Sequence, residues 1–358
     1  MQLNDLLEHT SEWLKGTGPD ANIVISSRVR LARNLERVPF PHWANKKQSE
    51  MTLQVIRKAI SQDDYLKSSM FLRLAEIDNI DKQFLVERHL MSREHAMRSD
   101  SKGIVVSGEE IASIMINEED HLRIQIMKSG FDLTEAWNII NSIDLSLSRR
   151  LPFAFSADLG YLTACPTNVG TGMRGSVMLH LPGLVMTKQI NKVLAAIAKL
   201  SFTTRGLYGE GTQAAGNFFQ ISNQVSLGQN EEEIIENIKG IIRQVIDQEN
   251  MARLALMQGG RQVLADRVFR AFGILKSAYI INSAETIEML SMLRLGQDLR
   301  IIKDIDRRMI NELLILTLPA HLQKIEKKKL GAQERDVKRA ALIRRKLECK
   351  SNTGRKST

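Results

Sequence analysis

Five arginines stand at positions where guanidinium groups could hold a polyphosphate. Arg28 and Arg30 lie two positions apart, so an extended strand would point both side chains to one face. Arg123 lies in an alternating segment on the face opposite its apolar residues, Arg174 follows a group of glycines, and Arg205 opens a glycine-bearing loop. Arginine suits phosphate because its planar fork donates two hydrogen bonds and stays charged. Each one alone is more simply a surface or salt-bridge residue, whereas five together favour a phosphate site if they converge.

The stretch from Gly170 to Gly175 has the pattern Gly-x-Gly-x-x-Gly. A dinucleotide site needs a helix after these glycines and an acidic residue about 20 positions on. Here a strand-like segment follows, and no Asp or Glu occurs between Leu159 and Gly209. A plain turn is therefore the simplest interpretation. The acid-free stretch nevertheless offers a polyphosphate a place without repulsion.

The elements that must position these residues change in character along the chain. Residues 111–117 and 121–127 predict an antiparallel hairpin around a short acidic turn. Residues 175–182, 201–207 and 217–228 predict further strands, residues 183–200 a helix, and residues 230–257 a long helix with Asn230 as its N-cap. Helical periodicity continues in residues 260–276, 284–295, 305–317 and 333–347. We expect an α+β fold, with an antiparallel sheet flanked by helices in a catalytic domain (1–255), an all-helical C-terminal domain (256–350) and a disordered tail (351–358).

Composition narrows the class of protein. The 358 residues are 43% hydrophobic and 25% charged, no apolar run would span a bilayer, and the two cysteines are too few for a disulfide framework. We expect a cytoplasmic protein with no membrane partner. The net charge of +9 lies entirely in residues 321–358, where 13 Lys or Arg face 4 Asp or Glu. This basic segment either attracts a polyanion or only keeps the protein soluble.

Four segments resemble the ATP:guanidino phosphotransferase (phosphagen kinase) family in order and separation. They are SSRVRLARN, NEEDHLR, CPTNVGTGMRGS and RGLYGEG. Far fewer residues precede the first segment than in small-molecule members, and the chain continues further beyond the last. The motif Arg335-Asp336-x-x-Arg339-Ala340 resembles one found in the bacterial protein-arginine kinases of this family.

The resemblance implies a glutamine-synthetase-like sheet and a set of site residues. Glu119, Glu210 and Cys165 correspond to the groups that handle the guanidinium, and Arg335, Asp336, Arg339 and Ala340 to a regulatory phosphoarginine pocket. The residues that correspond to the ATP site are Ser26, Ser27, Arg28, Val29, Arg30, His89, Arg123, Arg174, Gly175, Ser176, Val177, Met178, Arg205, Gly206, Leu207, Tyr208, Gly209 and Glu210.

The implied reaction moves the γ-phosphoryl group of ATP to an arginine side chain of a protein. A guanidinium has a pKa above about 12 and no free lone pair, so a proton must leave it. We expect Glu119 to act as general base, Glu210 to orient the group and Cys165, as a thiolate, to favour its binding. Without the resemblance, the acidic turn reads as a solvated hairpin and Cys165 as a packed side chain.

The resemblance also implies cofactors and partners. No protein metal cage is visible, which fits Mg²⁺ bound through ATP phosphates and water. We expect a homodimer formed by the helical domain, and a stress-response role with the activator McsA, the repressor CtsR and the unfoldase ClpC.

Two other functions stay open. A small-molecule phosphagen kinase would differ in its substrate. A scaffold that reads phosphoarginine or binds nucleic acid without catalysis would use the basic segment. Aromatic residues are only 5% of the chain and do not interleave with this segment, so nucleic acid is disfavoured.

Overall fold

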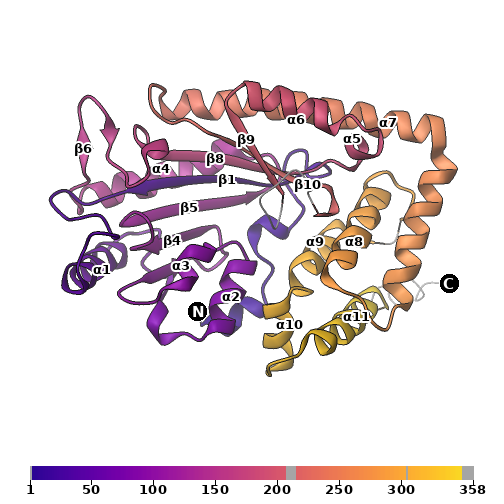
Figure 1. Cartoon of the computed structure of the whole chain (residues 1–358), viewed down its shortest axis with the longest axis horizontal. Coiled ribbons are helices and arrows are strands. Elements are labelled where there is room, and N and C mark those ends of the chain that lie inside the picture. Colours follow the sequence, from indigo (N-terminus) through magenta and orange to yellow (C-terminus); the bar gives the residue numbers. More distant parts are fainter. Residues whose placement is uncertain (1, 207–214, 304, 349–358) are drawn as a thin grey trace.

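An eight-stranded antiparallel sheet forms the centre of the molecule (Figure 1). The computed structural model describes residues 2–206, 215–303 and 305–348. The strand order is β2-β3-β4-β5-β1-β8-β10-β9. The strands are β1 (Val24–Arg33), β2 (Met70–Arg73), β3 (Gly103–Val106), β4 (Ala112–Ile116), β5 (Leu122–Ser129), β8 (Met173–His180), β9 (Phe202–Gly206) and β10 (Phe218–Asn223), and a separate hairpin has β6 (Phe155–Ser156) and β7 (Gly160–Tyr161).

The two faces of the sheet differ because side chains alternate along each strand. In β1, Val29 and Leu31 are fully buried on one face, whereas Arg28 and Arg30 are half-buried on the other. The expected hairpin is confirmed: β4 pairs with β5, and the apolar side chains of β5 lie opposite Arg123. One face is therefore apolar and the other carries the guanidinium groups.

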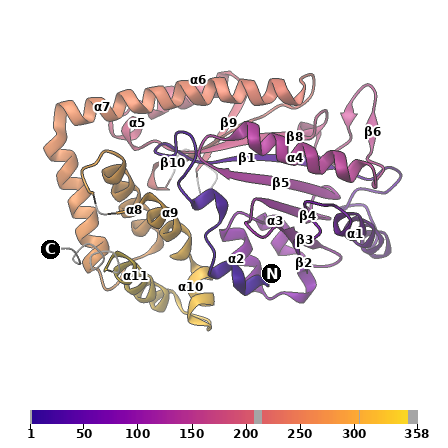
Figure 2. The same ribbon diagram turned by 180° about the vertical axis from the view of Figure 1, so that it is seen from behind.

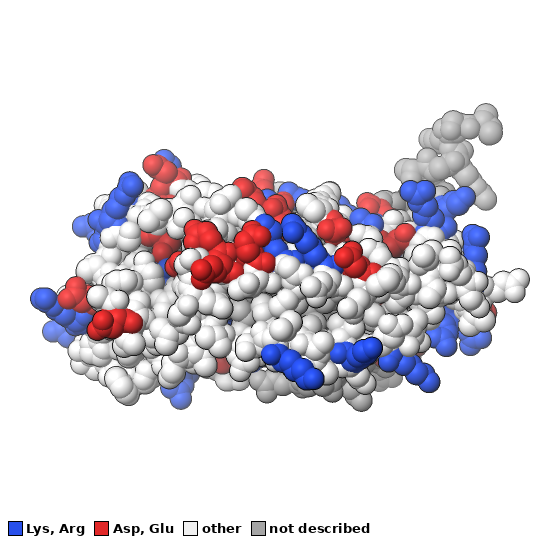
Figure 3. Space-filling model, turned by 90° about the horizontal axis from the view of Figure 1, so that it is seen from above, with Lys and Arg blue, Asp and Glu red and all other residues white. Residues whose placement is uncertain are grey.

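Helices cover the apolar face of the sheet (Figures 1 and 2). The continuous core contains side chains of α1 (Lys46–Ser61), α4 (Leu133–Ser148), α5 (Pro182–Met186), α6 (Ile190–Lys199) and the first half of α7 (Glu231–Ser277). The N-cap of α7 is Asn230, whose side chain accepts a bond from the Glu233 amide in a capping box. Figure 3 looks onto α6 and α7 and shows that their outer surface carries mixed acidic and basic groups.

The other face is covered only at its two sides. Near β2, β3 and β4 lie α2 (Asn79–Glu87) and α3 (Arg93–Met97). At the other side, the helical C-terminal region packs against Ile25, Met127, Met178 and Phe218 of the sheet. This region contains the second half of α7 with α8 (Ser283–Asp298), α9 (Arg307–Leu316), α10 (Pro319–Glu326) and α11 (Ala332–Glu348). The arginine-bearing middle of the face stays open between them.

The glycine motif is a turn followed by a strand, as the simplest interpretation of the sequence predicts. Gly170 and Gly172 have φ of 108° and 64°, which favours glycine, and β8 begins at the next residue. Gly175 has a different reason, since a Cβ there would lie 2.4 Å from the Ile238 side chain of α7. No dinucleotide-type helix follows the motif.

The helical predictions need two corrections and five additions. Residues 183–200 form two helices, α5 and α6, because the chain turns at Lys188, where φ is 59°. Residues 230–257 and 260–276 join in the single element α7, which is distorted at Gly260 (φ −165°). None of α1, α2, α3, α4 and α10 was predicted from the sequence. The expected domain boundary at 255–256 falls within α7, close to this distortion.

Within the residues that the structure describes, no helix is long and apolar enough to cross a membrane.

Candidate active site

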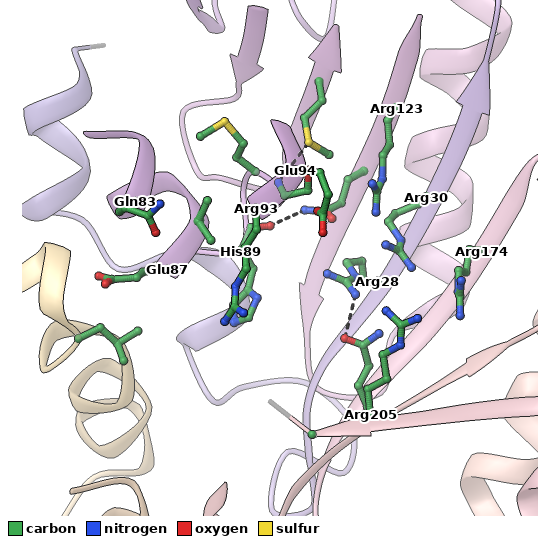
Figure 4. A pocket seen from close by; sticks show the side chains of 18 of the residues that line it. Arg28, Arg30, Gln83, Glu87, His89, Arg93, Glu94, Arg123, Arg174 and Arg205 are labelled. Carbon is green, nitrogen blue, oxygen red and sulfur yellow. Dashed lines mark hydrogen bonds between the residues drawn. The ribbon is translucent and has the colours of Figure 1, made fainter. Parts of the chain in front are cut away.

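The five predicted phosphate-binding arginines line one cavity on the open face of the sheet. The cavity has a volume of about 800 Å³ and includes Arg28, Arg30, Arg123, Arg174 and Arg205. Figure 4 shows their guanidinium groups pointing toward a shared space. Gln83, Glu87 and His89 from α2 and the loop after it face them across the cavity.

Strand register explains this convergence. Arg30 stands directly opposite Arg174 across the β1–β8 ladder, and Arg28 opposite Ser176. Arg205, in β9, stands opposite Gln220 of β10. Directly opposed side chains on one face of an antiparallel pair lie about 5 Å apart. The sheet thus brings together arginines that are far apart in the sequence.

Hydrogen bonds to uncharged neighbours hold two of these arginines, Arg28 and Arg174, in place. Arg28 donates to Ser176 Oγ at 3.2 Å and to Gln220 Oε1 at 2.9 Å. Arg174 donates to Thr203 Oγ1 at 3.0 Å and to Ser222 Oγ at 3.2 Å. Side chains held in this way are preorganised before a ligand arrives.

Arg123 is anchored by an acid instead. Its Nη1 donates to both carboxylate oxygens of Glu118, at 2.8 and 2.7 Å. Glu118 also accepts a bond from Ser92. Arg123 lowers the pKa of Glu118 against the effect of burial, so the pair stays charged.

The clustered positive charge shows in the pKa values of the arginines. Burial, followed by the charges of Arg123, Arg174 and Arg205, lowers the pKa of Arg28 to about 9. Burial and the same kind of repulsion lower the pKa of Arg30 well below its usual value. A bound anion would relieve this repulsion, so the cavity is electrostatically prepared for a polyanion.

Two buried nitrogen atoms at the cavity have no hydrogen-bond partner among the described residues. They are Nε of Arg30 and Nε2 of His89. Burial and the charges of Arg28 and Arg93 lower the pKa of His89 to about 3, so its ring is neutral. Buried polar groups are normally paired, and unpaired ones mark places where a ligand can bond.

Beside the cavity lies a smaller hollow of about 130 Å³ that contains Glu119 and Cys165. Arg30, Arg123 and Arg174 line both spaces. A group held by Glu119 would therefore meet a phosphate held by the arginines.

Glu119 lies in the loop between β4 and β5, and hydrogen bonds of the two residues that follow it fix the shape of this loop. Asp120 accepts bonds from the Ala164 amide at 2.7 Å and from Asn34 Nδ2 at 2.6 Å. His121 accepts a bond from the Leu35 amide at 3.0 Å. Glu119 itself is exposed. The loop is more than a solvated turn, because its other polar side chains fix its shape.

Although the residue is exposed on the surface, partial desolvation of its carboxyl group, followed by the charges of Asp120 and Glu118, raises the pKa of Glu119. A carboxylate with a raised pKa is a stronger base than an ordinary one. The Sγ atom of Cys165 lies 3.1 Å from Thr167 Oγ1, and the residue is half-buried. These groups suit the handling of a guanidino group.

Several residues of the predicted ATP segments point away from the cavity. Ser27, Val29, Gly175 and Val177 lie on the helix-covered face, where Ser27 Oγ donates to the Gly130 carbonyl at 2.9 Å. Their side chains do not line the cavity. Ser26, Ser176 and Met178 face the open side and line a small hollow beside it, and Gly206 lines the cavity itself. Leu207, Tyr208, Gly209 and Glu210 lie outside the described residues.

The predicted phosphoarginine motif lies in α11 with a different arrangement from the one expected. Arg339 is buried and donates to the carbonyls of Thr317 and Ile281, each at 2.8 Å. Asp336 pairs with Arg339. Arg335 is half-buried and donates to the Leu330 carbonyl at 2.9 Å. Arg339 therefore anchors α11, because its bonds are satisfied within the domain. Ala340 is buried in the helical core.

Sequence reasoning missed residues that line the cavity or hold its arginines in place. Glu118 precedes the predicted base Glu119. Its position on the other arm of the predicted hairpin turn from Arg123 could have indicated an ion pair between them. Gln220 and Glu87 gave no signal, because each reaches the cavity through tertiary packing. Glu87 also accepts bonds from the amides of Ala320 and His321, at 2.8 and 3.0 Å, which joins α2 to the start of α10.

Comparisons with known proteins agree with this geometry. Residues 50–252 match the family model of the ATP:guanido phosphotransferase C-terminal catalytic domain. Residues 261–357 match the model of the protein-arginine kinase McsB C-terminal domain.

Curated relatives match along nearly the whole chain. The protein-arginine kinase of Halothermothrix orenii is 47% identical over 97% of this chain and 99% of its own length. That of Pelotomaculum thermopropionicum is 49% identical over 94% of this chain and 96% of its own.

Solved structures share the fold. A lombricine kinase aligns with a TM-score of 0.58 at 24% identity, covering 72% of this chain and 76% of its own. A duplicated taurocyamine kinase from Schistosoma mansoni, with transition-state analogue components, aligns with a TM-score of 0.60 at 24% identity, covering 78% of this chain and 43% of its own.

The antiparallel sheet, the arginine-lined cavity and these matches define the class: the chain belongs to the ATP:guanido phosphotransferase family. Within that family, its full-length similarity is to the protein-arginine kinases.

Proposed function

We propose that this protein transfers the γ-phosphoryl group of ATP to the guanidino group of arginine side chains in proteins. The observation that carries this function is the single cavity lined by five arginines, which adjoins a hollow with Glu119. Full-length similarity to protein-arginine kinases supports the choice of acceptor.

The arginines would bind the triphosphate and neutralise charge in the transition state. Phosphoryl transfer depends mainly on position and on stabilising charge at the phosphate oxygens. Arg28 and Arg174 are suited to this work because serine, threonine and glutamine side chains fix them without neutralising them. Loss of one such donor should raise the barrier by roughly 3 kcal/mol.

Glu119 would accept the proton of the attacking nitrogen. As the bond between nitrogen and the γ-phosphorus forms, the bond from that phosphorus to the ADP oxygen breaks, and the proton moves to the Glu119 carboxylate. Glu210 would orient the guanidino group, and a Cys165 thiolate would favour its positive charge.

Mg²⁺ would accompany ATP. In the described part of the chain, no three His, Cys, Asp or Glu side chains lie close enough to hold a metal ion by themselves. This donor set fits an ion bound mainly by phosphate oxygens and water, with Glu94 as an exposed carboxylate at the cavity. When bound, the ion supplies further neutralisation of phosphate charge.

The helical region would bind phosphoarginine and join two subunits. Arg335, the half-buried arginine of the motif, is the better candidate for contact with a phosphoryl group, while Arg339 positions α11. We also propose action in the cytoplasm during stress, with McsA, CtsR and ClpC as partners, on the strength of the family resemblance.

A substrate comparison tests the function. Purified protein is incubated with ATP, Mg²⁺ and either an unfolded protein, free arginine or creatine. We expect acid-labile phosphate on the protein and far less on the small molecules. Equal phosphorylation of free arginine or creatine would instead favour a small-molecule kinase, the activity named for the structural neighbours. The Arg174→Ala variant should lose about 10²-fold or more in rate.

A further inference from the structure

Large apolar side chains are exposed on two loops at the end of the sheet where Glu119 lies. Trp43 is 74% exposed, Phe155 61% and Leu159 48%. Both loops lie at the same end of the molecule, which carries α1 and β6 in Figure 1. Apolar groups that gather on one surface mark interaction sites, and aromatic residues dominate the energetics of such sites. We call Phe40, His42, Trp43, Phe155 and Leu159 the aromatic rim.

The first loop holds its rings in a fixed arrangement. The amides of Trp43 and Ala44 both donate to the Phe40 carbonyl at 2.9 Å, which closes a turn. The rings of His42 and Trp43 lie 4.8 Å apart, and those of Phe40 and His42 stack at 6.1 Å. α1 begins at Lys46, and Asn45 is its N-cap. The exposed ring of Trp43 is thus held by a hydrogen-bonded turn that leads directly into a helix.

The second loop is the β6–β7 hairpin, which is equally well supported. Phe155 stands opposite Tyr161, and their rings meet edge to face at 5.2 Å. The guanidinium of Arg33 stacks on the Tyr161 ring at 3.5 Å. Arg33 is itself paired with buried Asp144 at 2.8 Å. The exposed face of Phe155 is therefore held by the core of the catalytic region.

Hydrogen bonds connect both loops to the hollow that holds Glu119 and Cys165. The Glu36 amide donates to the Pro152 carbonyl at 2.8 Å, so the two loops begin side by side. His121, two residues after Glu119, bonds the Pro39 carbonyl at 3.0 Å. Asn34 Nδ2 donates to the Leu162 carbonyl at 3.0 Å, three residues before Cys165. The rim and the hollow are parts of one rigid assembly.

Electrostatics agree with this proximity. The charge of His42 in the first loop lowers the pKa of Glu119, although burial and the neighbouring acids raise it more strongly.

We propose that the aromatic rim binds the polypeptide on either side of the target arginine and favours apolar flanking residues. This inference rests on the proposed function, because it concerns the acceptor of the same site. The bonds from His121 to Pro39 and from Asn34 to Leu162 place both loops next to the elements that form the hollow, so a chain with its arginine in the hollow would continue along the rim. Glu36 and Arg37 in the first loop have opposite charges, so their net charge favours neither acidic nor basic segments.

Two synthetic peptides test the rim, each with one arginine, flanked in one by Leu and Phe and in the other by Ser and Gly. The double variant Trp43→Ala/Phe155→Ala is compared with wild-type protein and with Phe269→Ala, which removes a similarly exposed ring from α7. We expect wild type to prefer the apolar peptide. In the double variant, kcat/KM for that peptide should fall about tenfold through KM, as expected for lost binding of remote groups. The polar peptide, the KM for ATP and the Phe269→Ala control should stay unchanged.

The possible results distinguish a failure of the aromatic-rim proposal from a failure of the proposed arginine kinase activity. If wild type phosphorylates both peptides equally, or the double variant retains the preference, the rim does not bind substrate. If wild type phosphorylates no arginine in either peptide or in unfolded protein, the proposed function itself fails.

Discussion

At the scale of single residues, the site combines concentrated positive charge with the Glu119 carboxylate. Arg28 and Arg30 have lowered pKa values because burial and neighbouring guanidinium groups oppose their charge. Glu119 has a raised pKa because burial and two adjacent acids oppose its charge. Both effects cost stability in the free protein and favour ligands of opposite charge.

Glu119→Gln should lower the rate of arginine phosphorylation by about 10² to 10⁴-fold while leaving ATP binding intact. The general base works only when deprotonated, so wild-type kcat/KM falls as pH drops through its pKa. Because that pKa is raised, the acidic limb should lie above 4.5. The measurement is a pH profile of kcat/KM. An unchanged acidic limb in the glutamine variant would assign the limb to another group.

Arg30→Met should make the nucleotide-free protein more stable and abolish most of its response to ATP. The change removes a guanidinium with an unpaired buried Nε and three repelling neighbours. We expect a gain of about 1 kcal/mol in the free energy of unfolding. Thermal unfolding with and without ATP measures both effects. The control Arg243→Met changes an exposed arginine of α7 and should alter neither; a loss of stability in Arg30→Met would contradict the charge argument.

At the scale of elements, strand register and one glycine turn set the shape of the hollow. The Ala32 amide donates to the Gly172 carbonyl at 2.9 Å, and Gly172 lines the hollow with Glu119 and Cys165. A Cβ at this glycine would lie 2.7 Å from the Ala32 carbonyl oxygen, in a backbone conformation with φ of 64°.

Gly172→Ala should therefore destabilise the protein by about 1 to 3 kcal/mol and slow catalysis by shifting the turn away from β1. Chemical denaturation and kcat report the two effects. Gly228→Ala is the matched control, because φ there is also positive at 80° but nothing lies within 4 Å of the added Cβ. Equal losses in the two variants would show that conformational strain alone, and not the close approach, matters at Gly172.

The sequence predicted the side-chain directions in the strands better than the number of helices, the breaks between them or the contacts between elements. Alternation predicted the open face of β1 and β5, and with it the positions of Arg28, Arg30 and Arg123, because side-chain direction in a strand follows from spacing. The break at Lys188 was missed since the apolar period continues across it. The roles of Gln220, Glu87 and Arg339 were missed because each depends on elements brought together only by folding.

At the scale of the whole molecule, a buried ion network fixes the helical region against the sheet. The Asp298 side chain is 1% exposed and lies 3.1 Å from Arg294, 2.8 Å from Arg307 and 3.7 Å from Arg253. Arg294 also donates to the carbonyls of Ala21 and Asn22, just before β1. The cavity wall at Leu318 and Pro319 belongs to this same helical region, so the docking of the two parts shapes the ATP site.

Asp298→Asn should cost about 3 to 5 kcal/mol of folding free energy, because three guanidinium groups lose their shared counter-charge. Denaturant unfolding measures the loss. Glu36→Gln, which breaks an exposed pair with Arg37, should cost less than about 1 kcal/mol. Similar small losses in both variants would mean that Asp298 does not hold the two parts together.

The most direct test of the account is to find which atoms receive phosphate. Unfolded protein is incubated with ATP, Mg²⁺ and the purified enzyme, and the modified side chains are mapped by mass spectrometry under conditions that preserve acid-labile bonds. The account predicts phosphate on arginine side chains with wild type and its near-complete loss with Glu119→Gln. Phosphate confined to serine, threonine, histidine or lysine, or arginine phosphorylation undiminished in Glu119→Gln, would contradict it.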